Sequence, residues 1–121
     1  MCTQTTIDVN ARGMQVELVD NWHPRWREVL DAIDFVGQRQ SLHVDPDGWL
    51  SARQNLLVAF VDDAVAGHLC FRVEPARGAR VAAKLESIEV QPGFAREEVQ
   101  TILLLAAEKR AHVLRCRQWS T

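Results

Sequence analysis

Glu86 and Glu89 are the side chains of this sequence best suited to general acid–base chemistry, because both lie in the largely apolar stretch Lys84–Val90. The stretch alternates as a half-buried strand does. Strict alternation places the two glutamates on opposite faces of that strand, so at most one can point into a given cleft. Glu86, which would share its face with Ile88, is the better buried candidate. The alternative is a solvated or ion-paired glutamate.

Metal and thiol chemistry have weaker support. His43, Asp45 and Asp47 lie close together, but they fall in a turn, and the fragment Asp-x-Asp-Gly lacks the distal glutamate of a calcium loop. We therefore expect no metal site. The chain contains no tyrosine, which removes the phenolic hydroxyl as a proton donor. The cysteines are scattered, odd in number and without a C-x-x-C pair, which indicates a reducing setting: Cys2, Cys70 and Cys116.

A turn and a long helix follow the strand and would position these groups. Pro92 and Gly93 end the strand, since proline cannot donate to a ladder and glycine tolerates a bend. From Arg96 onward the apolar residues recur at helical spacing. We expect one buried helix face formed by Val99, Ile102, Leu103, Ala106 and Ala107. Acidic residues begin the helix and basic residues end it, the order that a helix dipole favours.

The strand end Val90-Gln91-Pro92 and the helix ILLLAAEKRA at residues 102–111 resemble the GNAT superfamily of acyl-CoA-dependent N-acetyltransferases. In that family a strand ending V-x-P precedes a loop of the form R-x-x-G-x-G and a helix reading ALL-x-x-AE-x-R-A. The strand end and the helix match. The loop lacks the first basic residue and both glycines, since it reads Ala95-Arg96-Glu97-Glu98-Val99-Gln100.

The resemblance implies a reaction in which an amine attacks the thioester of acetyl-CoA or another acyl-CoA as co-substrate. Family members bind the pantetheine arm through the strand backbone and the pyrophosphate through N–H groups at the helix start. By position, the pantetheine contacts fall to Ile88, Glu89 and Val90. The phosphate loop would comprise Phe94, Ala95, Arg96, Glu97, Glu98, Val99 and Gln100. Glu86 would accept the proton of the amine acceptor through a water molecule.

A non-catalytic domain of the same fold, which binds a small ligand or a protein partner, is the alternative. The altered loop, the missing tyrosine and the short C-terminus favour it. The family match favours the enzyme. The sequence itself names no acceptor.

The remaining sequence predicts the other elements of an α/β fold. Met14–Val19 alternates as a strand, and a helical face then runs from Trp26 to Val36. Asn55–Val73 reads as a hairpin that turns at Asp62-Asp63. A short helix is possible at Trp49–Arg53, and the last strand is expected at His112–Trp119.

We therefore expect a mixed, mainly antiparallel sheet with helices on both faces, in a single domain over residues 14–121, after a flexible N-terminus over residues 1–13. The additional C-terminal strands that complete most family members are missing. An uncovered strand edge invites pairing, so we expect a homodimer with the C-terminal strand near the contact.

The composition is that of an ordinary globular protein, and its charge argues against two classes of partner. The chain has 121 residues, 47% of them hydrophobic, and a net charge of −2. This charge offers no footprint for nucleic acid or for an anionic membrane. No apolar run approaches the length of a membrane span, and the N-terminus does not read as a signal peptide. We expect a cytoplasmic protein.

Overall fold

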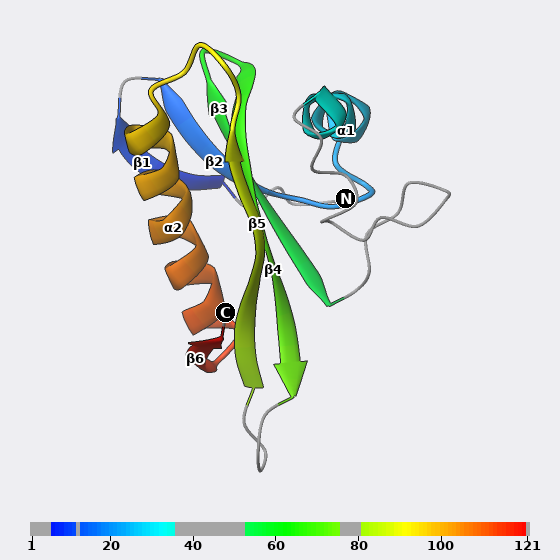
Figure 1. Ribbon diagram of the computed structural model, residues 1–121, viewed down its shortest axis with the longest axis vertical. Coiled ribbons are helices and arrows are strands. Elements are labelled where there is room, and N and C mark those ends of the chain that lie inside the picture. The colour runs from blue at the N-terminus through cyan, green and yellow to red at the C-terminus, as the bar shows by residue number, and fades with distance from the viewer. Residues whose placement is uncertain (1–5, 12, 36–52, 76–80, 121) are drawn as a thin grey trace.

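The computed structural model describes residues 6–11, 13–35, 53–75 and 81–120, which form one sheet with a helix on each side (Figure 1). The strands lie in sequence order in the sheet, and every neighbouring pair is antiparallel except β5 and β6, which are parallel. This is the expected mixed, mainly antiparallel α/β fold. The elements are β1 Thr6–Ala11, β2 Met14–Val19, α1 Trp26–Phe35, β3 Gln54–Val61, β4 Ala64–Pro75, β5 Val81–Val90, α2 Arg96–Val113 and β6 Cys116–Ser120.

The hairpin of β3 and β4 forms as predicted. Asp62 and Asp63 make its turn with φ angles of 49° and 69°. Two positive φ angles in succession suit a two-residue hairpin turn, and aspartate tolerates this region better than most residues. The register runs from Val61 opposite Ala64 to Gln54 opposite Arg72, with one irregularity beside Ala59.

Two hydrophobic cores lie on the two faces of the sheet. The core under α2 is built from the apolar face of that helix, and the five residues expected there are all buried: Val99, Ile102, Leu103, Ala106 and Ala107. The core under α1 is smaller, and it joins Val29 and Ile33 of the helix to Leu56, Val58 and Phe60 of β3. Alternate residues of β3 thus serve opposite faces, as a central strand requires.

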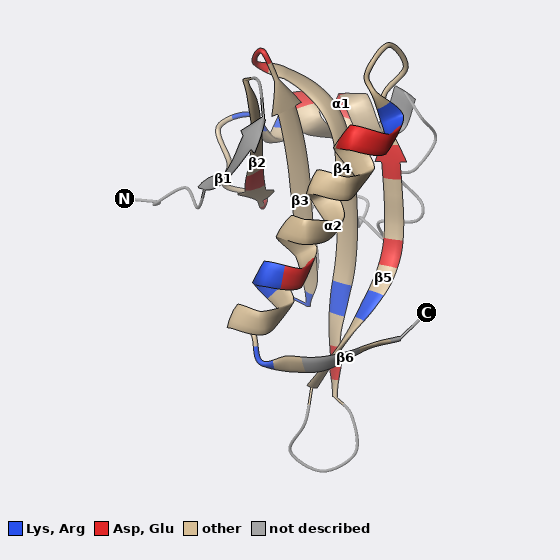
Figure 2. Ribbon diagram, turned by 90° about the vertical axis from the view of Figure 1, so that its left-hand side faces the viewer, with Lys and Arg blue, Asp and Glu red and all other residues tan. Residues whose placement is uncertain are grey.

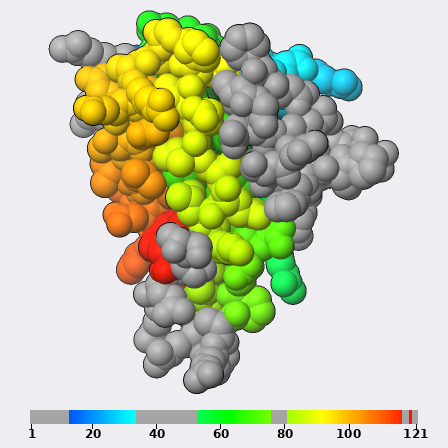
Figure 3. Space-filling view, in the orientation of Figure 1, coloured from blue at the N-terminus to red at the C-terminus, as the bar shows by residue number. Residues whose placement is uncertain are grey.

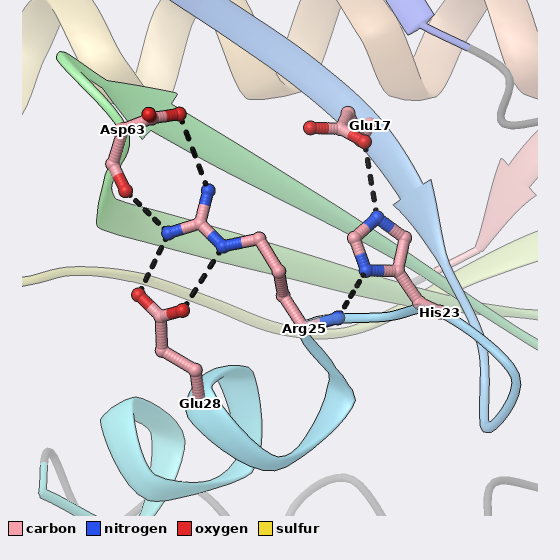
Figure 4. Close-up of polar contacts among 5 residues, drawn as sticks. All are labelled: Glu17, His23, Arg25, Glu28 and Asp63. Atoms are coloured by element: carbon pink, nitrogen blue, oxygen red, sulfur yellow. Dashed lines mark hydrogen bonds and ion pairs between the residues drawn. The ribbon is translucent and has the colours of Figure 1, made fainter.

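Polar contacts fix the start of α1 against the sheet (Figure 4). His23 lies between two groups, since its Nδ1 accepts from the Arg25 N–H at 3.0 Å and its Nε2 lies 3.0 Å from Glu17 Oε1. The Arg25 guanidinium contacts Glu28 at 2.7 Å and 2.9 Å and also donates to the carbonyl of Asp63. The same guanidinium stacks on the Phe60 ring. The turn before α1 is therefore tied to β2 and to the β3–β4 hairpin.

Two terminal segments differ from expectation. The flexible N-terminus expected over residues 1–13 does not hold for Thr6–Ala11, which pairs with β2 as strand β1. β-Branched residues in this segment favour an extended chain, and Gly13, with a φ of 71°, allows the chain to turn back. The last strand begins at Cys116 rather than His112, because α2 continues to Val113.

The possible helix at Trp49–Arg53 and the turn at residues 43–48 lie almost wholly outside the described residues. No helix in the described ranges has the length and apolar character needed to cross a membrane.

Candidate functional site

A β-bulge at Glu86 sets the geometry of the candidate site. On β4, Cys70 and Phe71 are neighbours, but their partners on β5 are Ser87 and Leu85, so Glu86 is the extra residue. The bulge shifts the alternation of β5. Leu85 packs into the α2 core before it, and Ile88 packs into the same core after it.

Glu86 and Glu89 consequently lie on the same face of the sheet, and the prediction that they lie on opposite faces is wrong. Glu89 pairs with His68, and His68 pairs with Val58, which belongs to the α1 core. Glu86 contacts Arg72 from the same face. Strict alternation failed here because the bulged strand places two residues against one on its partner.

Within the described part of the chain, side chains of β3 and β4 contact Glu86. Its Oε1 accepts from Gln54 Nε2 at 3.2 Å and lies 3.9 Å from the Cys70 thiol, and its Oε2 lies 3.5 Å from the Arg72 guanidinium. Only 9% of the Glu86 side chain is exposed. Burial and the nearby Glu86 carboxylate raise the pKa of the Cys70 thiol, so the thiol stays protonated and can only donate weakly.

His68 and Ser87 lie on the same face of the sheet as Glu86, Glu89, Cys70 and Arg72, and we call these polar side chains the polar row. The sequence pattern alone did not single out His68 and Ser87. His68 is 1% exposed, and burial lowers its pKa to about 4, while the charge of Glu89 opposes that shift. Ser87 is also buried. The signal was present, because His68, Cys70 and Arg72 recur at every second position of β4 and must share a face.

No described strand pairs with the outer edge of β5 beside Ile88 and Val90. The Gln91 N–H donates to the Ala66 carbonyl on β4 at 2.7 Å. Backbone groups of successive residues turn alternately to the two sides of a strand, so those of Val90 and Ile88 point away from β4. Among the described residues, β6 pairs with β5 only over Val81–Lys84 and leaves this part of the edge uncovered.

The Glu89 carboxylate already occupies one backbone N–H donor on this edge. Its Oε1 accepts a hydrogen bond from the Val90 N–H at 3.2 Å. A ligand carbonyl that approached this edge would compete with that carboxylate for the same donor. Of the three residues predicted to hold pantetheine, Ile88 and Val90 thus offer backbone groups, and Glu89 covers one of them.

The start of α2 offers backbone donors beside two negative charges. Ala95 precedes the helix in an extended conformation, and no side chain caps the first turn. The first N–H groups of a helix have no intrahelical acceptor. Glu97 and Glu98 are exposed in this turn, where Figure 2 shows acidic colouring. Val99 is 1% exposed, so it supports the loop from the core and does not face solvent.

The rest of the predicted phosphate loop lies between solvent and core. Arg96 is exposed, while Gln100 and Phe94 are half-buried, and Phe94 packs against the α2 core. Gly93 has a φ of 91° and turns the chain between strand and helix. Figure 3 shows the second half of β5 and the start of α2 as one continuous region of the surface. The predicted pantetheine and phosphate residues are therefore neighbours.

Other candidate groups do not join this site. Cys116 pairs with Val81 at the far end of β5, several residues from Glu86. Within the described ranges no group of histidine, cysteine and acidic residues could hold a metal ion. His43, Asp45 and Asp47 lie outside those ranges.

Comparison with solved structures reveals the same architecture in several acetyltransferases. A ribosomal-protein-alanine N-acetyltransferase from Brucella melitensis biovar Abortus 2308 has a TM-score of 0.72 at 15% identity, over 88% of this chain and 77% of that chain. An aminoglycoside acetyltransferase from an uncultured soil metagenomic sample, in complex with sisomicin, has a TM-score of 0.71 at 14% identity, over 89% and 76%.

A GNAT family acetyltransferase from Staphylococcus aureus subsp. aureus USA300_TCH1516 is also similar, with a TM-score of 0.65 at 11% identity, over 88% of this chain and 84% of that chain. A scan against protein-family models and a search of curated proteins found no match. At these identities the similarity concerns the fold. The chain has the fold of the GNAT acetyltransferases, as its strand end at Val90 and its long helix predict.

Proposed function

We propose that this protein transfers an acetyl or other acyl group from acyl-CoA to an amine. The observation that carries the proposal is the position of Glu86. Its buried carboxylate lies on the bulge of β5, a few residues before the backbone edge at Ile88 and Val90, with which no described strand pairs. A carboxylate held beside a thioester-binding edge is placed to take the proton of an attacking amine.

The reaction would need one nucleophile, one proton acceptor and one leaving group. The amine nitrogen would attack the thioester carbonyl and form a tetrahedral intermediate. Its proton would pass to Glu86, directly or through water, and the C–S bond would then break to release the CoA thiolate. Gln54 and Arg72 would hold the Glu86 carboxylate in position. The backbone of Ile88 and Val90 would orient the thioester.

A non-catalytic, ligand-binding domain is the second candidate, and two observations favour it. The Glu89 carboxylate occupies the Val90 N–H at the edge where pantetheine would bind. Glu97 and Glu98 place negative charge at the helix start where the pyrophosphate would lie. Both features would weaken acyl-CoA binding by charge repulsion or by competition for a donor.

Release of free CoA from acetyl-CoA, measured with a panel of small primary amines, separates the two candidates. If Glu86 is the proton acceptor, Glu86→Gln should lower the rate by roughly 10²- to 10⁴-fold, the usual range for losing a general base. Glutamine keeps the shape of the side chain, and its single amide oxygen can still accept from either Gln54 or Arg72, so the fold should survive.

Glu108→Gln, on the exposed side of α2, is the matched control and should leave the rate unchanged. Equal rates for the wild type and Glu86→Gln would refute the assigned role of Glu86. Acetyl-CoA binding without CoA release in the wild type, across the whole panel, would favour the non-catalytic candidate.

A further inference from the structure

The side of α2 that faces away from the sheet is apolar at its middle. A helix on a protein surface usually carries polar residues on that side. Here Leu104 and Leu105, called the leucine pair below, are each 47% exposed at the centre of an 18-residue helix. In Figure 2 the middle of α2 is uncharged, between an acidic first turn and a charged segment near the end.

Charged residues of opposite sign lie along the same face on the two sides of the leucine pair. At 3.6 residues per turn, Glu97 and His112 point within about 60° of the direction between the two leucines. Glu98 and Lys109 lie together along one flank of this face, and all four side chains are exposed. The face is therefore acidic at its start, apolar at its centre and basic at its end.

Such a face is complementary to itself when one copy is reversed. A two-fold axis at the leucine pair, the commonest symmetry of protein dimers, brings the two apolar centres together. Glu97 then lies level with the partner's His112, and Glu98 lies about 3 Å along the axis from the partner's Lys109. The opposed helix dipoles add to this attraction. A parallel pair would instead bring Glu98 beside the same residue of the other copy.

We propose that a second copy of this chain docks on α2 in the opposite direction, with the leucine pair at the centre of the contact. This contact differs from the one that the sequence predicts near the last strand, and it does not depend on acyl transfer. A contact through one helix is small, and small interfaces are weak and transient. We expect a dissociation constant on the order of 100 µM, so the chain is mostly monomeric at low micromolar concentration.

The same contact would change the start of α2, which contains the candidate phosphate loop. Lys109 and His112 of the partner subunit would offset the charges of Glu97 and Glu98 that oppose a pyrophosphate. This consequence rests on the proposed function. If it holds, acetyl-CoA binds the dimer more tightly and by reciprocity strengthens dimerisation, about twofold or more at millimolar concentration.

Sedimentation velocity over a range of about 5 to 500 µM protein tests the contact, because this range spans the expected dissociation constant. The sedimentation coefficient of the wild type should rise with concentration. Leu104→Lys introduces a good helix former at an exposed position, so its melting temperature at the lowest concentration should match the wild type. Two like charges at the centre of the contact should keep this variant monomeric throughout.

Charge reversal tests the direction of the second copy. Glu98→Lys and Lys109→Glu each place like charges together twice in the dimer, so each should weaken self-association about tenfold. An equal mixture of the two variants should restore it, since each introduced lysine then meets an introduced glutamate or each native pair is kept. The two positions are about 16 Å apart within one chain, so this rescue requires contact between chains. Asp31→Lys, the same charge change on the exposed side of α1, is the control and should behave as the wild type.

Three results would overturn the proposal: a wild type that stays monomeric over the whole range, undiminished self-association of Leu104→Lys, and no rescue in the mixture. Acetyl-CoA added to the wild type separates the two levels. A dimer that acetyl-CoA does not strengthen would reject the link to the pyrophosphate and keep the contact. Failure of the CoA-release assay would reject acyl transfer without bearing on the contact.

Discussion

Residues of the α1 face combine deep burial with polar chemistry, and His68 is the extreme case. The ring lies between Val58 and Glu89 in the sheet and is almost inaccessible to solvent. Burial disfavours the charged imidazolium more than the nearby Glu89 carboxylate favours it, so the pKa falls to about 4. A neutral histidine in this position contributes to the pH dependence of stability.

The sign of that dependence follows from proton uptake. The unfolded chain protonates this histidine near pH 6.5, whereas the folded chain does so only near pH 4. Between these values the unfolded state binds more protons, so acid destabilises the fold. Relative to His68→Leu, the wild type should lose roughly 3 kcal/mol of unfolding free energy between pH 7 and pH 4.

Urea denaturation at a series of pH values measures this difference. The leucine variant cancels the contribution of carboxylates that are common to both proteins. Parallel pH profiles for the two proteins would contradict the lowered pKa of His68.

Among the elements, α2 packs on the sheet, and its first turn forms part of the candidate phosphate loop. Leu103 is completely buried at the centre of the helix, while its neighbour Leu104 is 47% exposed. Leu103→Ala should cost roughly 2–5 kcal/mol, the range for emptying a buried leucine site. Leu104→Ala makes the same chemical change on the outer face and should cost about 0.5 kcal/mol or less.

Chemical denaturation of both variants provides the comparison. A cost for Leu103→Ala below about 1 kcal/mol, or equal costs for the two variants, would contradict the assignment of the buried face.

Periodicity predicted α2 and the β3–β4 hairpin because both depend on local patterns: a repeating apolar face and an aspartate turn. It failed at β5, since a bulge arises from how two strands pair and leaves no mark in the alternation of either strand alone. It also failed at the end of α2, where His112 and Val113 suit a strand by composition but continue the helix. The polar atoms of His68, Arg72 and Ser87 that find no partner within the described residues could not be predicted, because the tertiary packing decides whether a buried side-chain atom meets a hydrogen-bond partner.

At the scale of the whole molecule, acyl-CoA binding should appear as a change in thermal stability. Glu97 and Glu98 would each oppose a nearby pyrophosphate by a few kcal/mol at most, reduced by solvent. We therefore expect a dissociation constant in the high micromolar to millimolar range. At 1 mM acetyl-CoA the melting temperature should then rise by only about 2 °C.

Replacing Glu98 and Gln100 with glycine removes one charge and two Cβ atoms from the loop. A tenfold tighter complex would raise the melting temperature by about 5 °C under the same conditions. Glu108→Gly, the same type of change farther along α2, controls for added helix flexibility. A low-micromolar constant in the wild type would contradict the expected weak binding, and no shift in either protein would mean that this fold binds no acyl-CoA here.

The bulge at Glu86 also shifts the alternation of β5 by one residue, so different positions face α2 in its two halves. Before the bulge, odd-numbered residues such as Ala83 and Leu85 face α2, whereas after it even-numbered residues such as Ile88 and Val90 do so. Deletion of Glu86 itself would remove the bulge and leave the apolar residues of both halves facing α2 in one regular alternation, whereas insertion of one residue into either half would turn part of that half over. Apolar residues would then meet α1, or carboxylates would meet the core under α2. Insertions in this strand should therefore be far less tolerated than point substitutions, while deletion of the bulged residue should keep the two faces of the strand as they are.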